Sequence, residues 1–328
     1  MHLAWLFLGF LWAPQVSASV RNNKFRPWFP YFDYHWRQVA QDQCVTEIRD
    51  FHANNRERFH SPFAAALNCI LENSGESIKS NLANSQVVLG LTPTIMSFMG
   101  SDIAEVAALS SHHPLLTIIL SLGAPGLQIR HIFIPLEVAK IVNKTPSKYV
   151  RLYHGWLTNQ YRVVRRLFNF GLYALAIGAV TNNITASLYL DSRAVVGFRC
   201  GAILMPLAWG LLGLFPALFA MGAVRQQYGL PNLTLRQSGK GAQIERSRNL
   251  MKESFEAPRR WICEALFSAA AVAGVLQLFY GTSILSAMTP VSFFDALPIV
   301  VRYAASNIVC RALLLVELDR VRIGLHGL

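Results

Sequence analysis

The chain has 328 residues, of which 53% are apolar and only 15% are charged, and its mean hydropathy is +0.32. Soluble domains carry about 25% charged residues, so the composition excludes a disordered chain, a collagen-like chain and a small disulfide scaffold, and it predicts a membrane protein. The net charge of +12 does not predict a nucleic-acid partner, because the Lys and Arg residues concentrate in two loops between apolar runs.

The first residues have the pattern of a secretory signal peptide. Leu3–Ala13 is an apolar run too short to span a bilayer comfortably, and the small residues Val16-Ser17-Ala18 follow it. We predict that residues 1–18 are a signal peptide cleaved after Ala18. The alternative is an uncleaved anchor, because little positive charge precedes the apolar run.

Residues 19–86 are expected to form a lumenal or extracellular segment with nearly balanced charge. Its first part is dense in aromatic side chains, and Pro27 and Pro30 prevent a regular helix there. Two interpretations of these rings stay open. They could anchor the segment at the membrane interface, which suits rings that are apolar at one end and polar at the other, or they could form the core of a small packed cap.

Cys44 and Cys69 both lie in this segment. A signal peptide would place them in an oxidising compartment, where disulfides persist, so we predict a Cys44–Cys69 disulfide. On the chain-entropy model it would stabilise the fold by roughly 3 kcal/mol. Cys200, Cys263 and Cys310 lie in or beside apolar runs and are interpreted as buried, unreactive side chains.

Two apolar stretches follow that cannot both be full spans. Leu82–Met99 is interrupted by glycine and proline, and Leu115–Leu127 has only 13 residues. The connector Ser101–Pro114 carries acidic residues and no Lys or Arg, which is typical of a non-cytoplasmic loop. We therefore predict that Leu82–Met99 is re-entrant or interfacial and that His113–Ile129 is the first crossing.

Four further apolar runs predict transmembrane helices. Ala202–Val224 has no charge and Trp261–Leu285 has a single one, Glu264, so each is long enough to cross about 30 Å of hydrocarbon. Leu167–Leu190 carries three Asn residues. Leu297–Val316 carries Arg302 and Arg311, which could face the bundle interior.

The expected fold is all-α, a multi-pass transmembrane helical bundle over residues 87–328 with a small amino-terminal cap. It has five spans, or six if Leu82–Met99 also crosses. The loops Arg130–Arg166 and Arg225–Arg260 each hold eight basic side chains, against one and three acidic ones, which predicts that both are cytoplasmic. The carboxyl tail is then cytosolic, and the protein belongs in a secretory-pathway membrane, either the endoplasmic reticulum or the plasma membrane.

The chain contains three Asn-x-Ser/Thr sequences, which accept a glycan only where they face the lumen. Asn183-Ile184-Thr185 falls in a predicted lumenal loop, so Asn183 is the expected glycosylation site. Asn143 and Asn232 fall in the two basic loops and are expected to stay unmodified.

The common enzyme motifs are missing from the sequence, and one cluster of ionisable residues is left as a candidate for chemistry. Asp102, Glu105 and His112 would share one face of a helix beside the membrane. Asp102 and Glu105 could act as catalytic acid and base, or hold a metal together with His112 and His113. The structural alternative is a capping box, with Asp102 as the N-cap and Glu105 three residues later.

Glu264 and Asp295 are the remaining acids at membrane depth, where an ionisable side chain suggests a function by default. The alternative is structural for both. Glu264 would pair with Arg259 or Arg260, and Asp295 would cap a helix. The two acids are expected on opposite sides of the membrane, so they do not predict a joint site.

Part of the chain resembles a group of integral membrane proteins of filamentous fungi that have no assigned activity. The likeness covers Cys44–Gln128 and rests on Val88-Leu89-Gly90-Leu91-Thr92-Pro93-Thr94-Ile95, Gly100-Ser101, Glu105, His113-Pro114-Leu115-Leu116 and Leu122-Gly123-Ala124-Pro125. The group has Ser in place of Ala124 and Arg in place of His113, which argues against a metal site shared by the whole family. The resemblance implies a fungal secretory-pathway membrane protein and names no chemistry.

The expected function is that of a multi-pass membrane protein of the fungal secretory pathway, with the lipid bilayer as its partner and no assignable activity. The first alternative is a membrane-embedded acid/base cyclase or isomerase that acts through Asp102 and Glu105 on a lipophilic secondary metabolite or prenyl substrate. The second is a transporter, which is disfavoured because the chain shows no inverted repeat. No cofactor or metal is indicated, and nothing indicates an oligomeric state.

Overall fold

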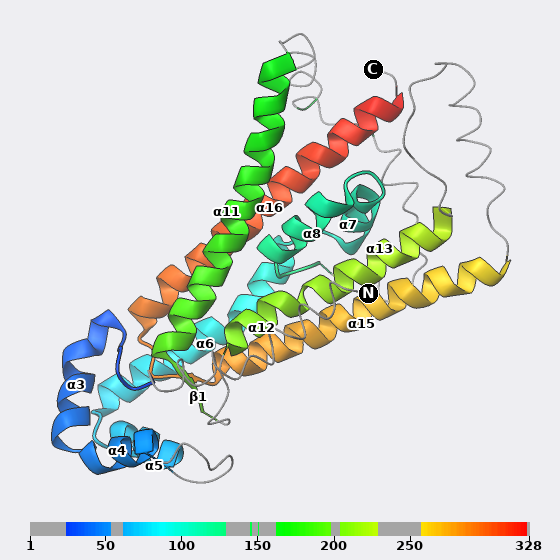
Figure 1. Ribbon diagram of the computed structural model, residues 1–328. Coiled ribbons are helices and arrows are strands. Elements are labelled where there is room, and N and C mark those ends of the chain that lie inside the picture. The colour runs from blue at the N-terminus through cyan, green and yellow to red at the C-terminus, as the bar shows by residue number, and fades with distance from the viewer. Residues whose placement is uncertain are drawn as a thin grey trace. The chain divides into compact units, whose positions relative to one another are not determined.

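The computed structural model describes residues 24–53, 62–128, 145, 150, 162–197, 204–228 and 257–326 of the chain (Figure 1). Most of these residues lie in helices, and the expected all-α fold is confirmed. The predicted signal peptide, residues 1–18, and most of both basic loops lie outside the described residues.

The chain forms two compact units, each assembled from three separated stretches. The first unit comprises Met1–Thr92, Ile184–Ala208 and Gly281–Arg302, and the second comprises Pro93–Asn183, Trp209–Tyr280 and Tyr303–Leu328. Each unit therefore depends on contacts between segments far apart in the sequence.

The amino-terminal cap is a helical cluster in the first unit, drawn in shades of blue in Figure 1. It contains the short 3-10 helix η1 (Pro30–Phe32) and the helices α3 (Asp33–Asp42), α4 (Val45–Ala53) and α5 (Pro62–Glu72). Its core is built largely from aromatic and branched side chains: Phe25, Trp28, Trp36, Val39, Leu67 and Ile70.

The rings of the aromatic segment divide into a buried and an exposed group, and the membrane-interface interpretation stays a prediction for the exposed ones. Trp28, Phe29 and Trp36 are buried, as the packed-cap interpretation expects. Tyr31 and Tyr34 are 52% and 82% exposed, so they are the two rings available to a membrane interface.

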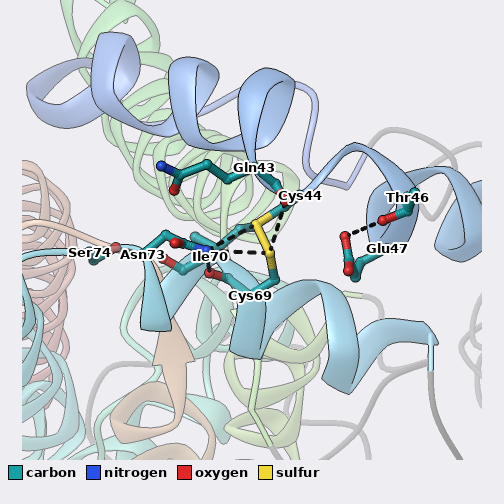
Figure 2. The surroundings of a disulfide bond; sticks show 8 residues. All are labelled: Gln43, Cys44, Thr46, Glu47, Cys69, Ile70, Asn73 and Ser74. Atoms are coloured by element: carbon teal, nitrogen blue, oxygen red, sulfur yellow. Dashed lines mark hydrogen bonds between the residues drawn. A yellow bond between two sulfur atoms is a disulfide. The ribbon is translucent and has the colours of Figure 1, made fainter.

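The cap is closed by the predicted disulfide (Figure 2). Cys44 lies between α3 and α4, Cys69 lies on α5, and their Cα atoms are 5.9 Å apart. The side-chain amide of Asn73 lies 3.9 Å and 3.6 Å from the two sulfur atoms and donates to the carbonyl of Cys69 at 2.9 Å. The Cys44–Cys69 disulfide is therefore confirmed.

Removing this disulfide with the double substitution Cys44→Ala/Cys69→Ala is expected to destabilise the cap by about 3 kcal/mol, because the unfolded chain regains the entropy of a loop spanning 25 residues. The measurement is the unfolding midpoint in detergent, followed by cap tryptophan fluorescence. A reductant should lower the midpoint of the wild type and leave that of the double variant unchanged. Equal midpoints for the two proteins would contradict the prediction.

A buried ion pair fastens the start of the described chain to the end of helix α11 (Arg162–Arg193). Lys24 Nζ lies 3.5 Å from Asp191 Oδ1, and it donates to the backbone carbonyls of Asp191 and of Ala194, the latter at 2.8 Å. A cation at this position complements the negative end of the helix dipole. Burial lowers the pKa of Lys24, and the neighbouring Asp191 carboxylate opposes this shift.

Four helical segments are long and apolar enough to cross a membrane: Arg166–Arg193, Met205–Gln226, Trp261–Ser286 and Phe293–Ile323. They lie in α11, in α12 (Met205–Leu212) with α13 (Leu214–Tyr228), in α15 (Ala257–Ser286) and in α16 (Phe293–His326). Four of the five predicted crossings therefore coincide with helices that are long and apolar enough to span a bilayer. The break at Gly213 separates α12 from α13.

At the fifth predicted crossing, His113–Ile129, the described residues contain only a short apolar helix. The helix found there, α8 (Pro114–Gly123), has 10 residues and is about 15 Å long, half the thickness of the hydrocarbon layer. In contrast, Leu82–Met99 belongs to one continuous helix, α6 (Glu76–Met99), whose 24 residues cover about 36 Å. Gly90 and Pro93 do not interrupt it.

Several helices have residues in both units. They are α6, α11, α12, α15 and α16, whereas α13 belongs to the second unit alone. Helix α8 lies wholly in the second unit. In the first unit, β1 (Val195–Val196) after α11 pairs antiparallel with β2 (Met288–Thr289) before α16.

After α8 the chain continues as a buried, non-helical segment, Ala124–Gln128, inside the second unit. Side chains from three other helices donate to carbonyls in or beside this segment: Asn183 to Gly123, Gln277 to Pro125 and Ser97 to Leu127. The amide of Gln128 donates to Ser101 at 2.9 Å. Irregular backbone at membrane depth is tolerated where protein groups satisfy it in this way.

Candidate functional site

The two predicted catalytic acids form a capping box. Asp102 is the N-cap of α7 (Ile103–Ser110), and its Oδ1 accepts from the backbone amide of Ala104 at 3.1 Å. Glu105 Oε2 accepts from the backbone amide of Asp102 at 3.3 Å. These contacts match the structural alternative, because both carboxylates satisfy amides at the start of a helix that is otherwise buried.

The histidines that follow α7 do not join the acids in a metal site. Within the described ranges, no three His, Cys, Asp or Glu side chains gather closely enough to hold a metal ion. His112 and His113 form the turn between α7 and α8, and His113 is the residue before the first residue of α8. His113 instead faces a carboxylate of α16, as described below.

Acidification is expected to destabilise the second unit through His112. Burial, and then the neighbouring His113, lower the pKa of His112 below its ordinary value of 6.5. The unfolded chain then takes up a proton at a higher pH than the folded protein, so this contribution is fully present above about pH 6.5 and is lost as the pH falls below it. Melting temperatures at pH 7.5 and 5.5 should differ less in His112→Gln than in the wild type. Equal differences would refute this role.

A pocket of about 360 Å³ lies in the second unit where α8 begins, α11 begins and α16 approaches its end. Its polar lining is His113, Asn169, Tyr173, Glu317 and Arg320, and its apolar lining is Leu116, Leu172 and Val321. The volume falls in the range of small-molecule sites, which combine apolar walls with a few placed polar groups.

Glu317 is the central polar group of this pocket. Its side chain is 6% exposed, and its Oε1 accepts from Arg320 Nη1 at 2.5 Å. Arg320 also donates to Asn169 Oδ1 at 3.1 Å, and its guanidinium lies 5.7 Å from the ring centre of Phe168. The other carboxylate oxygen, Oε2, lies 4.0 Å from His113 Nε2.

Glu317 lies toward the carboxyl end of the candidate span Phe293–Ile323 in α16. Asp295 in the first turn of α16 and Glu317 are 22 residues apart, or about 33 Å along the helix axis. That separation matches the roughly 30 Å of hydrocarbon. Asp295 is a cap, as its structural alternative expects. Its Oδ2 accepts from Ser292 Oγ at 2.6 Å, and its own amide donates to that hydroxyl at 3.0 Å.

Arg302 and Arg311 bond to neighbouring helices, which gives both a structural role. Arg311 Nη1 donates to the carbonyls of Met99 and Gly100, at 3.1 Å and 2.8 Å, at the end of α6. Arg302 Nη2 donates to Thr185 Oγ1 of α11 at 2.6 Å. Glu264 is exposed on α15, and the side chains of its expected partners lie outside the described part of the chain.

The structure places the expected glycosylation site, Asn183, in surroundings that do not favour a glycan. Asn183 lies inside α11, in a candidate span, and is only 6% exposed. Its Nδ2, the atom that would carry a glycan, donates to the carbonyl of Gly123 at 2.8 Å. The lumenal loop expected at this sequon does not exist, because α11 continues to Arg193.

The acid of the pocket was not among the residues singled out by sequence. His113 was noted for its neighbours Asp102 and Glu105, whereas its partner Glu317 is 204 residues away. The available signal was local. Glu317, Asp319, Arg320 and Arg322 form acid–base pairs three residues apart directly after the apolar run of α16.

The fold and this pocket define an all-α, multi-pass membrane protein with a disulfide-bonded amino-terminal cap. No family model, no curated protein and no solved structure matches the chain. The function is therefore argued from the pocket and the helices themselves.

Proposed function

We propose that the protein is a multi-pass membrane protein of the secretory pathway that binds an amphiphilic small molecule in the pocket between α8, α11 and α16. The observation that carries this proposal is the buried carboxylate of Glu317 beside the apolar walls of a pocket of about 360 Å³. A buried ionisable group at the edge of a membrane helix is costly, so it suggests a function. A ligand with a polar end and an apolar body would match both parts of the lining.

The same proposal makes α6 the first crossing and α7 with α8 a re-entrant piece. Exposed apolar side chains at Val87, Leu91, Ile95 and Phe98 follow one another at three- and four-residue steps, so they form one face of α6. Lipid is the natural neighbour of such a face. Helix α7 is buried except at Glu105 and packs against α8 and α13, as a re-entrant helix must.

With α6 as a crossing, the helices alternate in the orientation that the basic loops require. The cap and the β1–β2 pair then lie on the lumenal side, where an oxidising environment preserves the Cys44–Cys69 disulfide. In this orientation the Glu317 pocket lies on the cytoplasmic side. The likeness of residues 44–128 to fungal membrane proteins makes a filamentous fungus the expected host.

The orientation can be tested by glycan mapping in microsomes. The substitution Arg56→Thr creates an Asn-x-Thr acceptor sequence that begins at Asn54, within the amino-terminal segment. This variant should gain an endoglycosidase-sensitive mass, whereas the wild type should carry no glycan at Asn143, Asn183 or Asn232. A glycan on Asn143 or Asn232 of the wild type would reverse the proposed orientation.

The binding function can be tested by mass spectrometry of the protein purified in mild detergent. The wild type should carry a lipophilic molecule at about one per chain. Val321→Trp should lose it, because the indole fills the pocket. Val301→Trp is the matched control, since Val301 lies on the same helix and is 58% exposed. The variant Asp102→Asn/Glu105→Gln should keep the ligand, and its loss there would favour a role for the capping acids beyond stability.

A further inference from the structure

We infer that the polar end of the pocket binds the hydroxyl group of a lipophilic alcohol, held between His113 Nε2 and Glu317 Oε2. This inference rests on the proposed binding function and names the chemical class of the ligand.

We call the space between His113 Nε2 and Glu317 Oε2 the hydroxyl seat. The distance between these two atoms sets its geometry. His113 Nε2 and Glu317 Oε2 are 4.0 Å apart, which is too far for a direct hydrogen bond. A third atom placed between them can lie at about 2.8 Å from both, an ordinary hydrogen-bond length. The gap therefore fits one bridging atom of a ligand.

The chemistry of the two groups selects that atom. An ionised carboxylate oxygen only accepts, and a ring N–H of histidine donates. In the tautomer with the proton on Nε2, the bridging atom donates to Glu317 and accepts from His113, which a hydroxyl oxygen does. An ether or ketone oxygen has no proton to donate to the carboxylate. An ammonium group has no lone pair to accept a hydrogen bond from the imidazole N–H.

Neighbouring side chains hold the carboxylate in place for this role. Arg320 engages Oε1 at 2.5 Å and is itself held by Asn169 at 3.1 Å, so the bound oxygen is fixed and Oε2 is left toward His113. Glu317 as a whole is 5% exposed. A buried acceptor of this kind discriminates strongly, because a ligand without a donor leaves it unpaired.

The apolar lining of the pocket determines what kind of hydrocarbon body the ligand can have. Leu116, Leu172 and Val321 supply apolar walls next to the seat, and the volume of about 360 Å³ suits a compact hydrocarbon body. A prenyl alcohol and a sterol share this chemistry, since each has one hydroxyl group on a hydrocarbon frame. The experiment has to distinguish these two sources.

The test uses purified full-length protein in nanodiscs and compares farnesol with farnesyl methyl ether, which keeps the chain and loses the donor. Farnesol is expected to bind about ten- to a hundredfold more tightly, the range of a hydrogen bond to a charged group. In Glu317→Gln the amide nitrogen would face the seat while its oxygen stays on Arg320, so the preference should fall to about twofold or less. Comparing the affinities of ergosterol and farnesol shows whether the pocket prefers a sterol or a prenyl alcohol.

The outcomes separate this inference from the binding proposal. Equal affinity of alcohol and ether in the wild type overturns the hydroxyl seat while leaving an amphiphile pocket. A preference that persists in Glu317→Gln is steric, and it also overturns the seat. If Glu317→Gln does not fold, His113→Phe, at a half-exposed position, should weaken farnesol at least about fivefold and leave the ether unchanged. The binding proposal itself is rejected if farnesol, farnesyl methyl ether and ergosterol all fail to bind and the mass spectra of Val321→Trp match those of the wild type.

Discussion

The substitution Gly126→Ala is expected to prevent the second unit from folding. A Cβ atom at Gly126 would lie 2.5 Å from the carbonyl oxygen of Met96 and 2.7 Å from the amide nitrogen of Ser97, and a Cβ at Gly100 would collide with the carbonyl of Gly126. The obstacle in each case is backbone of the crossing segment, which cannot turn aside as a side chain can. We expect a loss of more than about 4 kcal/mol, at the extreme of single substitutions.

The measurement is the yield of monodisperse protein in detergent, together with the SDS concentration at which it unfolds. Gly178→Ala is the matched control, because an added Cβ there meets no atom within 4 Å and Gly178 lies inside α11. This control should be as stable as the wild type, or more stable by up to about 1 kcal/mol, since Ala favours the helix. A folded, stable Gly126→Ala protein would show that the two backbone segments do not cross at this distance.

The second large effect is expected from Lys24→Met in the first unit. Lys24 is 5% exposed and Asp191 is 2% exposed, so the substitution leaves a buried carboxylate without its ion-pair partner. Removing one member of a buried pair typically costs about 3–5 kcal/mol. The unfolding midpoint of the cap should fall accordingly.

Two further variants separate the buried charge from other causes. Lys79→Met removes a cation from an exposed pair with Glu76, at 2.9 Å, and should cost less than about 1 kcal/mol. Lys24→Met/Asp191→Asn removes both charges of the buried pair and should recover part of the stability lost in the single variant. A single variant as stable as Lys79→Met would mean that the ion pair contributes little.

Much of the membrane fold could be predicted from sequence because the signal is local. The apolar runs that form the helical segments Met205–Gln226 and Trp261–Ser286 are continuous. Their length and composition were therefore sufficient to predict these helices. The Cys44–Cys69 pair could be predicted because the cap segment holds these two cysteines and a signal peptide implies an oxidising compartment.

The lengths of the helices at Glu76–Met99 and Pro114–Gly123 could not be predicted, because long-range contacts decide them. The carbonyls near the end of α6 are satisfied by side chains over 200 residues away: Asn307 donates to Met96, and Arg311 donates to Met99 and Gly100. Local pattern, with a proline inside the run, indicated a broken helix there. The burial of Asn183 could not be predicted for the same reason, because the carbonyl to which it donates, that of Gly123, is 60 residues away.

The proximity of His113 and Glu317 in the pocket could not be predicted from local sequence either. A capping box needs only three residues of context, so the structural role of Asp102 and Glu105 was available from sequence. Contact between His113 and Glu317 needs the whole arrangement of α8, α11 and α16. Only the helical spacing of Glu317 and Arg320 was visible locally.

The hydrogen bonds from α16 to α6 and α11 also impose an order on biosynthesis. Helices α6 and α11 leave the ribosome well before α16, and until Asn307 and Arg311 arrive the carbonyls of Met96, Met99 and Gly100 lack these donors. The same holds for Thr185 and Asn182, which bond to Arg302 and Ser306 of α16. Nascent chains that stop before α16 should therefore be degraded faster than chains that include it.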